Sequence, residues 1–271
     1  MRLRIVWLFV VLMILTSNAW AVGHLGPPTA GLNKGQWSIG YNYSYSTQDM
    51  DKANITYSNS DGYSEIGKVQ VEDFKTQRHY ATLSYGMEDW WEIYASIGVA
   101  DVKERAKETQ WPGDPNEYES ATNFDNDLAW GWGTKMTFAK QDNVAWGIAL
   151  QMNWLDTSWD DEGVDAVYGA YKDELNLESY DIVVAVGPTI DFGCWKLYGG
   201  PFYYCFNGDY DYKTSWADGF VEKESAKVRA DSNFGGYIGA QIPIADNWDF
   251  TTEVSMTGDG WGVGGGLAVK F

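Results

Sequence analysis

Apolar and polar residues alternate along much of this chain with a period of two. In the segment 37–46, the odd positions carry Trp, Ile and Tyr, whereas the even positions carry Ser, Gly or Asn. This alternation is typical of a β-strand that separates two different environments. Most such segments have about the 9–11 residues that a tilted strand needs to cross a bilayer. Nine further segments alternate in this way: 78–87, 91–100, 128–139, 144–154, 180–192, 195–206, 233–244, 248–256 and 261–271.

The connections between these segments alternate in length. Short connections such as "EDW" and "KQD" follow the second, fourth, sixth and eighth segments, and long ones follow the first, third, fifth and seventh. The last connection, 257–260, is a short link on the long-loop side. Short turns on one side and long loops on the other are typical of an up-and-down antiparallel barrel in an outer membrane. We therefore expect an all-β transmembrane barrel of ten strands, or of eight if one hairpin lies outside the membrane.

The distribution of charge assigns a side to each connection. Most of the 38 acidic residues lie in the four long connections, 47–73, 101–127, 155–179 and 207–231. Because a charge in the lipid-embedded wall costs about 2–4 kcal/mol, these connections are predicted to be acidic extracellular loops and the short turns to be periplasmic. The net charge of −19 argues against nucleic acid as a partner, since phosphate binding needs a basic surface.

Aromatic residues, which make up 16% of the chain, recur at the ends of the alternating segments. Trp and Tyr favour the interface between lipid and water, so the pattern predicts two girdles around a barrel embedded in outer-membrane lipid. The girdle expected at the short turns contains Trp37, Trp91, Trp195, Trp248, Tyr85, Phe138, Phe192 and Phe271. The second girdle contains Tyr45, Trp130, Trp154, Tyr180 and Trp261.

The first residues have the features of a secretory signal peptide. Arg2 and Arg4 precede an unbroken apolar run at 5–16, and Ala19 and Ala21 form an A-x-A cleavage site. A membrane anchor would need about 20 apolar residues, which is more than this run supplies. We expect a signal peptide at 1–21 with cleavage near Ala21, an N-terminal periplasmic segment at 22–35 and a barrel domain at 36–271.

Together these features resemble the small outer-membrane β-barrel proteins of Gram-negative bacteria. In that class the last strand commonly ends on an aromatic residue that follows apolar residues at alternate positions, and the barrel-assembly machinery reads this signal. The matching positions are Phe271, Val269, Leu267, Val263 and Trp261, with Gly265 interrupting the apolar series. The resemblance implies insertion into a bacterial outer membrane by that machinery. We also expect the barrel to be a monomer.

Several positions on the predicted inward face are charged. They could line a path for solutes, or they could form a network of ion pairs that fills the lumen, because isolated buried charges need partners. About eight strands leave an interior that side chains just fill, so we favour a plugged or very narrow lumen, with Lys135 and Glu253 as a pair at mid-height. The predicted lumen network is Arg78, Glu92, Lys135, Asp191, Glu253 and Lys270.

Two of the predicted loops gather acidic residues, at Asp156, Asp160, Asp161, Glu162, Asp165, Asp209 and Asp211. Oxygen ligands of this kind suit Ca²⁺, although neither loop has the spacing of an EF-hand, and a solvated charged face is the alternative interpretation. No other cofactor or metal is expected. Cys194 and Cys205 are too far apart along one strand for a disulfide, so both are predicted to be free thiols.

The sequence leaves several functions open. The main hypothesis is a barrel without catalytic activity that has a structural or surface-interaction role through its acidic extracellular loops. The alternatives are a narrow channel for small solutes, a rim enzyme acting on lipid or peptide, and a soluble secreted β protein. For the enzyme, His79 is the candidate general base, but no serine in a recognisable motif accompanies it. The omptin proteases have a similar strand count, yet none of their motifs is present.

Overall fold

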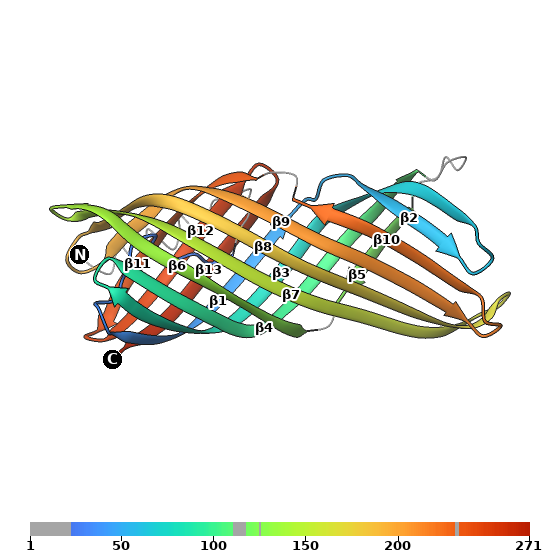
Figure 1. Cartoon of the computed structure of the whole chain (residues 1–271), viewed down its shortest axis with the longest axis horizontal. Coiled ribbons are helices and arrows are strands. Elements are labelled where there is room, and N and C mark those ends of the chain that lie inside the picture. The colour runs from blue at the N-terminus through green and yellow to red at the C-terminus, as the bar shows by residue number, and fades with distance from the viewer. Residues whose placement is uncertain (1–22, 111–117, 125, 231–232) are drawn as a thin grey trace, which may run out of the picture.

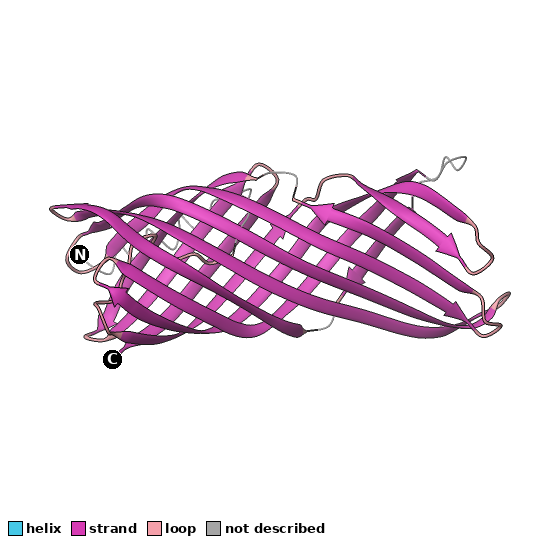
Figure 2. Ribbon diagram, in the orientation of Figure 1, coloured by secondary structure: helices cyan, strands magenta, loops and turns pink. Residues whose placement is uncertain are grey.

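The computed structural model describes residues 23–110, 118–124, 126–230 and 233–271. The predicted signal peptide, 1–21, lies outside the described residues. All regular structure in the described part is β (Figure 2), and no helix there is long and apolar enough to cross a membrane.

Thirteen strands form one antiparallel sheet in the described part of the chain (Figure 1). Every strand of the membrane wall lies at a segment predicted from the alternation, with differences in where the strands end. The strands are β1 (Trp37–Gln48), β2 (Ala53–Asn59), β3 (Ser64–Glu88), β4 (Trp91–Gln110), β5 (Tyr118–Asn123), β6 (Asp127–Gln141), β7 (Val144–Asp165), β8 (Gly169–Asp191), β9 (Lys196–Trp216), β10 (Val221–Arg229), β11 (Phe234–Ala245), β12 (Trp248–Thr257) and β13 (Gly260–Lys270).

Ten of these strands close into a ring. The order is β1, β13, β12, β11, β9, β8, β7, β6, β4 and β3, and β3 pairs back onto β1. The closing seam joins β1 to β13 from the pair Ser38 and Lys270 to the pair Gln48 and Gly260. At the end of the seam, Trp37 and Phe271 exchange backbone hydrogen bonds of 3.1 and 3.0 Å. The predicted ten-stranded antiparallel barrel is therefore confirmed.

The outside of this ring carries an apolar band with a sharp upper limit. On β4, Ile93, Ile97 and Val99 are exposed on the outer face, and the next exposed residues on that face are Lys103 and Arg105. An apolar band of this kind suits lipid, whereas the charged positions above it need water. Contacts between aromatic side chains lie where the girdles were predicted. At the short turns, the ring centroids of Trp37 and Tyr85 are 4.6 Å apart and those of Phe192 and Trp195 are 4.7 Å apart. Near the other end, the ring centroids of Trp130 and Trp154 are 4.3 Å apart.

The predicted long loops are mostly regular strands, so their interpretation as loops was wrong. Above the apolar band, β3, β4, β7, β8 and β9 continue, and β2, β5 and β10 are added between or beside them (Figure 1). We call this part, residues 49–77, 101–110, 118–124, 126, 155–179 and 206–230, the outer half. Many of its outward positions are charged, as suits a surface in water, and these charges hide the alternation of apolar residues at the inward positions.

The inward positions of the outer half form a hydrophobic core. Val102, Leu175 and Leu177 are at most 2% exposed, and the rings of Phe74 and Phe206 lie 5.4 Å apart. Burial of each such side chain contributes about 1.5–3 kcal/mol. The core, which extends down to the top of the barrel, includes Met50, Ile55, Val69, Val71, Phe74, Val102, Ala106, Phe124, Leu155, Leu175, Leu177, Phe206, Ala226 and Val228.

Candidate functional site

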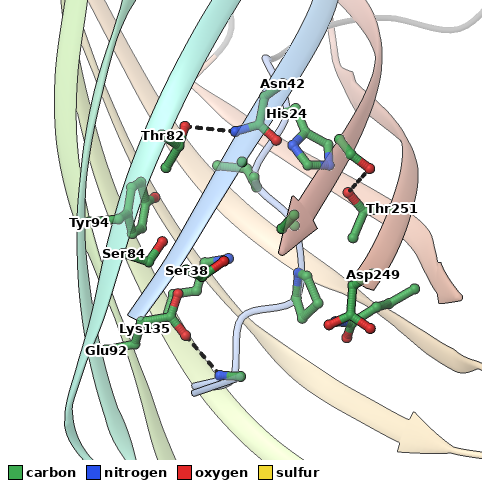
Figure 3. Close-up of a pocket in the computed structure, with 18 of the residues that line it drawn as sticks. His24, Ser38, Asn42, Thr82, Ser84, Glu92, Tyr94, Lys135, Asp249 and Thr251 are labelled. Atoms are coloured by element: carbon green, nitrogen blue, oxygen red, sulfur yellow. Dashed lines mark hydrogen bonds between the residues drawn. The ribbon is translucent and has the colours of Figure 1, made fainter. Parts of the chain in front are cut away.

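The N-terminal segment enters the barrel. Residues 22–35 were expected to form a segment in the periplasm, and the structure places residues 23–32 against the inner wall of the ring (Figure 3). His24 is directed into the lumen, near Asn42 and Thr251. We call residues 23–32 the plug, because they occupy the space that an open channel would need.

The plug is held mainly by two wall carboxylates. The backbone N–H groups of Leu25 and Gly26 each donate to one oxygen of Glu253, both at 2.9 Å. The N–H of Gly31 donates to Glu92 Oε2 at 2.8 Å. Because the plug pairs with no strand among the described residues, these side chains take the place of a β-ladder in satisfying its backbone donors. Three further bonds fix its middle and its end. Thr29 Oγ1 lies 2.9 Å from Thr189 Oγ1, the N–H of Ala30 donates to Thr137 Oγ1 at 3.1 Å, and Lys270 Nζ donates to the carbonyl of Gly31 at 3.1 Å.

Glycines on the inner wall make room for the plug. A Cβ added to Gly264 would lie 2.6 Å from His24 Cβ, and one added to Gly147 would lie 2.5 Å from the carbonyl oxygen of Pro28. Both distances are shorter than a van der Waals contact, so any side chain there would displace the plug. The glycines of the last strand therefore have a specific partner inside the barrel.

A Gly264→Val variant tests this fit. We expect the valine to overpack the contact with His24 and to lower the free energy of unfolding by about 1–3 kcal/mol. The measurement is urea unfolding of the detergent-solubilised barrel, followed by tryptophan fluorescence. Gly265→Val is the matched control, because residue 265 has the opposite parity and faces outward, where a valine is tolerated. Equal stability of the two variants would contradict the fit.

A second layer closes the lumen above the plug. Arg78 Nη2 and Asp181 Oδ2 form an ion pair of 2.7 Å, and both side chains are at most 10% exposed. Asn153 Nδ2 donates to the other oxygen of Asp181 at 2.7 Å. Beside this cluster, Gln48 Nε2 donates to Tyr204 Oη at 3.1 Å. The sequence analysis did not include Asp181 in the lumen network. It is an odd-numbered position of the same strand as Asp191, so the same alternation places both on one face.

The other predicted lumen residues have varied positions. Lys135 lies over the ring of Tyr94, 5.5 Å from its centroid, and no ion pair joins it to Glu253 within the described residues, so the predicted mid-height pair is not formed. Both oxygens of Glu253 instead accept N–H groups of the plug. Asp191 does not belong to the lumen: it is exposed at the β8–β9 turn, where it accepts the N–H of Gly193 at 2.7 Å.

A small cavity lies beside the plug, lined largely by β1, β3 and β4 and also by residues of the strands across the lumen (Figure 3). Its volume is about 150 Å³. The lining is polar, with Ser38, Ser84 and Ser96 among hydroxyl and amide side chains, and Asn42 donates to Thr82 at 2.8 Å. Lys270, predicted in the lumen, is at its edge and pairs with Asp249 at 2.7 Å. A cavity of this size and polarity can hold a few water molecules.

One buried carboxyl group lies in the core of the outer half. Glu104 on β4 is 6% exposed, and its Oε1 has no hydrogen-bond partner among the described residues. Burial disfavours the charged form and raises the pKa of Glu104 to about 7. The hydrophobic core therefore contains a group that changes its charge near neutral pH.

The stability of the protein should therefore fall as pH rises towards 7. The unfolded chain releases the Glu104 proton near pH 4.5, whereas the folded chain keeps it until about pH 7. The folded state binds more protons at Glu104 in this window, so the contribution of Glu104 to the free energy of unfolding falls by up to about 3 kcal/mol and is constant above the window. In urea unfolding across this pH range, Glu104→Gln should reduce the fall by about this amount, and Glu178→Gln, at an exposed position, should leave it unchanged. An unchanged pH profile in Glu104→Gln would contradict the assignment.

The acidic residues proposed for Ca²⁺ do not form a metal site. Among the described residues, no group of three or more His, Cys, Asp or Glu side chains has an arrangement that could hold a metal ion. Neighbouring acids on an extended strand point to opposite faces, which separates them. Asp165 instead accepts the N–H groups of Val167 and Tyr168 in the β7–β8 turn, at 2.7 and 2.9 Å, and Asp209 pairs with Lys227 at 2.6 Å.

His79 and the two cysteines lie on the wall of the barrel or at a turn. The His79 side chain is exposed, and its Nδ1 lies 2.6 Å from the Tyr41 hydroxyl. In the described part of the chain, no serine or carboxylate is hydrogen-bonded to the His79 ring. Cys194 is exposed at the β8–β9 turn and Cys205 is half-buried, and both are free thiols, as predicted.

No protein-family model matches the chain, and no curated protein matches its sequence. Solved structures with similar folds are outer-membrane barrels. They include the outer membrane protease OmpT from Escherichia coli, with 9% identity over 92% of this chain and 99% of that chain and a TM-score of 0.48. The outer membrane protein OprG from Pseudomonas aeruginosa has 11% identity over 89% and 98% and a TM-score of 0.36.

A third similar structure is the toluene transporter TbuX from Ralstonia pickettii, with 11% identity over 88% of this chain and 90% of that chain and a TM-score of 0.40. The chain has the fold of an outer-membrane β-barrel. The closed ring of ten strands shows this by itself, and the likenesses at these identities carry no argument about function.

Proposed function

We propose that the protein is an outer-membrane barrel with a closed lumen, and that it acts at the cell surface by contact with other molecules through its outer half. The observation that carries the proposal is the filling of the interior at three successive levels. The plug occupies the lower lumen, the ion pair of Arg78 and Asp181 lies above it, and the hydrophobic core fills the outer half. Solute passage would require all three to open.

The exposed apolar residues of the outer half support a contact role. At the β7–β8 turn, Val164, Val167 and Tyr168 are 80%, 79% and 68% exposed. The Tyr168 ring also lies 5.5 Å from that of Trp216, which belongs to the neighbouring hairpin. Exposed apolar groups that gather at one place are common at interaction surfaces. We infer no catalytic role, because His79 lacks the partners that a general base needs.

Conductance separates this proposal from the channel alternative. Purified protein inserted into planar bilayers should give no steady current at neutral pH. A stable ohmic conductance of the unmodified protein would overturn the closed-lumen proposal.

Thiol labelling on intact Gram-negative cells tests the orientation. A membrane-impermeant maleimide should label a Val167→Cys variant at the outer tip without permeabilisation of the outer membrane. The native Cys194 at the short turn should react only after permeabilisation. Cys205 is replaced by serine in both proteins, so that its thiol adds no background. The reverse labelling pattern would place the outer half in the periplasm and overturn the surface role.

A further inference from the structure

The outer half has an open side between β5 and β7. β7 pairs with β6 only as far as Leu155, and over residues 156–165 it pairs with β8 alone. β5 likewise pairs with β4 alone. In Figure 1 the outer part of β7 forms the margin of the sheet, and in the described part of the chain no strand pairs with this margin. We call residues 156–165 the β7 edge.

The backbone of the β7 edge presents regularly spaced free groups. The N–H of Ser158 donates to Asp127 Oδ2 at 3.0 Å, on the side away from β8. In an antiparallel pair, alternate residues direct both N–H and C=O away from their partner strand. Asp160, Glu162 and Val164 therefore direct their backbone groups to the open side, as Ser158 does. A strand added there would find a ladder of donors and acceptors already in place.

The side chains of the β7 edge carry negative charge that the fold neutralises only in part. Glu162 lies directly opposite Lys172, whereas Asp156 and Asp160 lie opposite acids. Asp156 lies directly opposite Glu178, and Asp160 lies directly opposite Glu174. Like charges in such positions are destabilising. Glu174 has two lysine partners at 2.8 Å, whereas the exposed Asp156 and Asp160 have no ion pair within the described residues. These acids therefore reduce the stability of the β7–β8 hairpin when no partner is bound, and they would favour a cationic partner.

We propose that the β7 edge binds an extended segment of a cationic protein, which adds to the sheet as a further strand with Lys or Arg at alternate positions. This inference rests on the proposed surface role and names the chemistry of its partner. Main-chain hydrogen bonds to Asp160, Glu162 and Val164 would give affinity, and the acidic side chains would select the charge. A second copy of this chain fits poorly, because pairing two β7 edges would bring acids against acids.

The test uses the whole barrel in detergent micelles and a fluorescent ten-residue peptide in which Lys and Thr alternate. A second peptide of the same sequence is N-methylated at alternate residues, so that it keeps the charge but cannot complete the ladder. Binding is measured by fluorescence anisotropy at low and at physiological salt. We expect the N-methylated peptide to bind at least tenfold more weakly than the unmodified peptide.

Two variants locate the site on the chain. Glu162→Pro removes one N–H that faces the open side and leaves the β7–β8 ladder intact, so peptide affinity should fall at least tenfold. Asp160→Asn should weaken binding several-fold and reduce its salt dependence. Asp218→Asn, at an exposed acid in the β9–β10 turn, is the charge control and should bind as the unmodified protein does. Heat-dependent gel migration confirms that each variant is folded.

Each failure has a distinct meaning. Equal binding of the N-methylated peptide would show charge attraction without strand addition and would overturn the inference. Unchanged affinity in Glu162→Pro and Asp160→Asn would also overturn it, because the peptide would then bind elsewhere. Absence of any peptide binding would reject the cationic partner, while absent conductance and surface labelling at residue 167 would still support the proposed function.

Discussion

Replacement of Glu253 by alanine is expected to lower the free energy of unfolding by about 2–6 kcal/mol. The carboxyl group accepts two backbone N–H bonds of 2.9 Å from the plug, and each buried donor that loses its acceptor costs about 1–3 kcal/mol. The variant also leaves the N–H groups of Leu25 and Gly26 buried without an acceptor. Urea unfolding in detergent micelles measures the loss, and hydrogen exchange of these two amides should become fast.

The control for this experiment is Glu88→Gln. Glu88 is exposed and pairs with Lys34 at 2.7 Å, and such a surface pair contributes about 0–1 kcal/mol. A loss of less than 1 kcal/mol in Glu253→Ala, with slow exchange retained at residues 25 and 26, would show that the plug is held by its shape alone.

The second large effect is expected for Asp181→Ala. The substitution leaves the Arg78 guanidinium buried without its partner and removes the acceptor of Asn153. Breaking a buried ion pair on one side costs about 3–5 kcal/mol. Urea unfolding in detergent micelles measures this loss of stability.

A double variant distinguishes the ion pair from general packing. Arg78→Met combined with Asp181→Leu removes both charges and keeps apolar volume, so it should be clearly more stable than Asp181→Ala alone. If the double variant is the less stable of the two, the cost lies in packing and not in the unpaired charge.

The barrel itself could be predicted because lipid makes its alternation conspicuous. A strand with lipid on one side and a polar lumen on the other must alternate between apolar and polar residues, and the segments 37–46 and 91–100 do so clearly. The outer half has water on one side and a hydrophobic core on the other. Its alternation, as in "KVQVED" around Val69 and Val71, is the reverse of that in the wall, and the many charges give it the composition of a loop.

Of the candidate site, only the residues that the barrel strands contribute could be predicted. Strand parity placed Arg78, Glu92 and Glu253 on the inward face, where the structure has them buried. Their partners could not be inferred, because the plug has no periodicity: "GHLGPPTAGL" contains Gly, Pro and Thr and makes no β-ladder. An irregular segment gives no local signal of the surface on which it packs. Parity also misplaced Asp191, since at the end of a strand the turn decides the direction of the side chain.

The glycine-rich seam between β1 and β13 has a consequence for alignment of the two strands. Gly260 and Gly266 leave room for the β1 side chains opposite them, Gln48 and Asn42, so a slip of two residues along β1 would lose this fit. Two further features oppose such a slip: the mutual backbone bonds of Trp37 and Phe271, and the packing of His24 over Gly264. The plug thus helps to fix the alignment of the closing strands, because His24 packs where Gly264 leaves space for it.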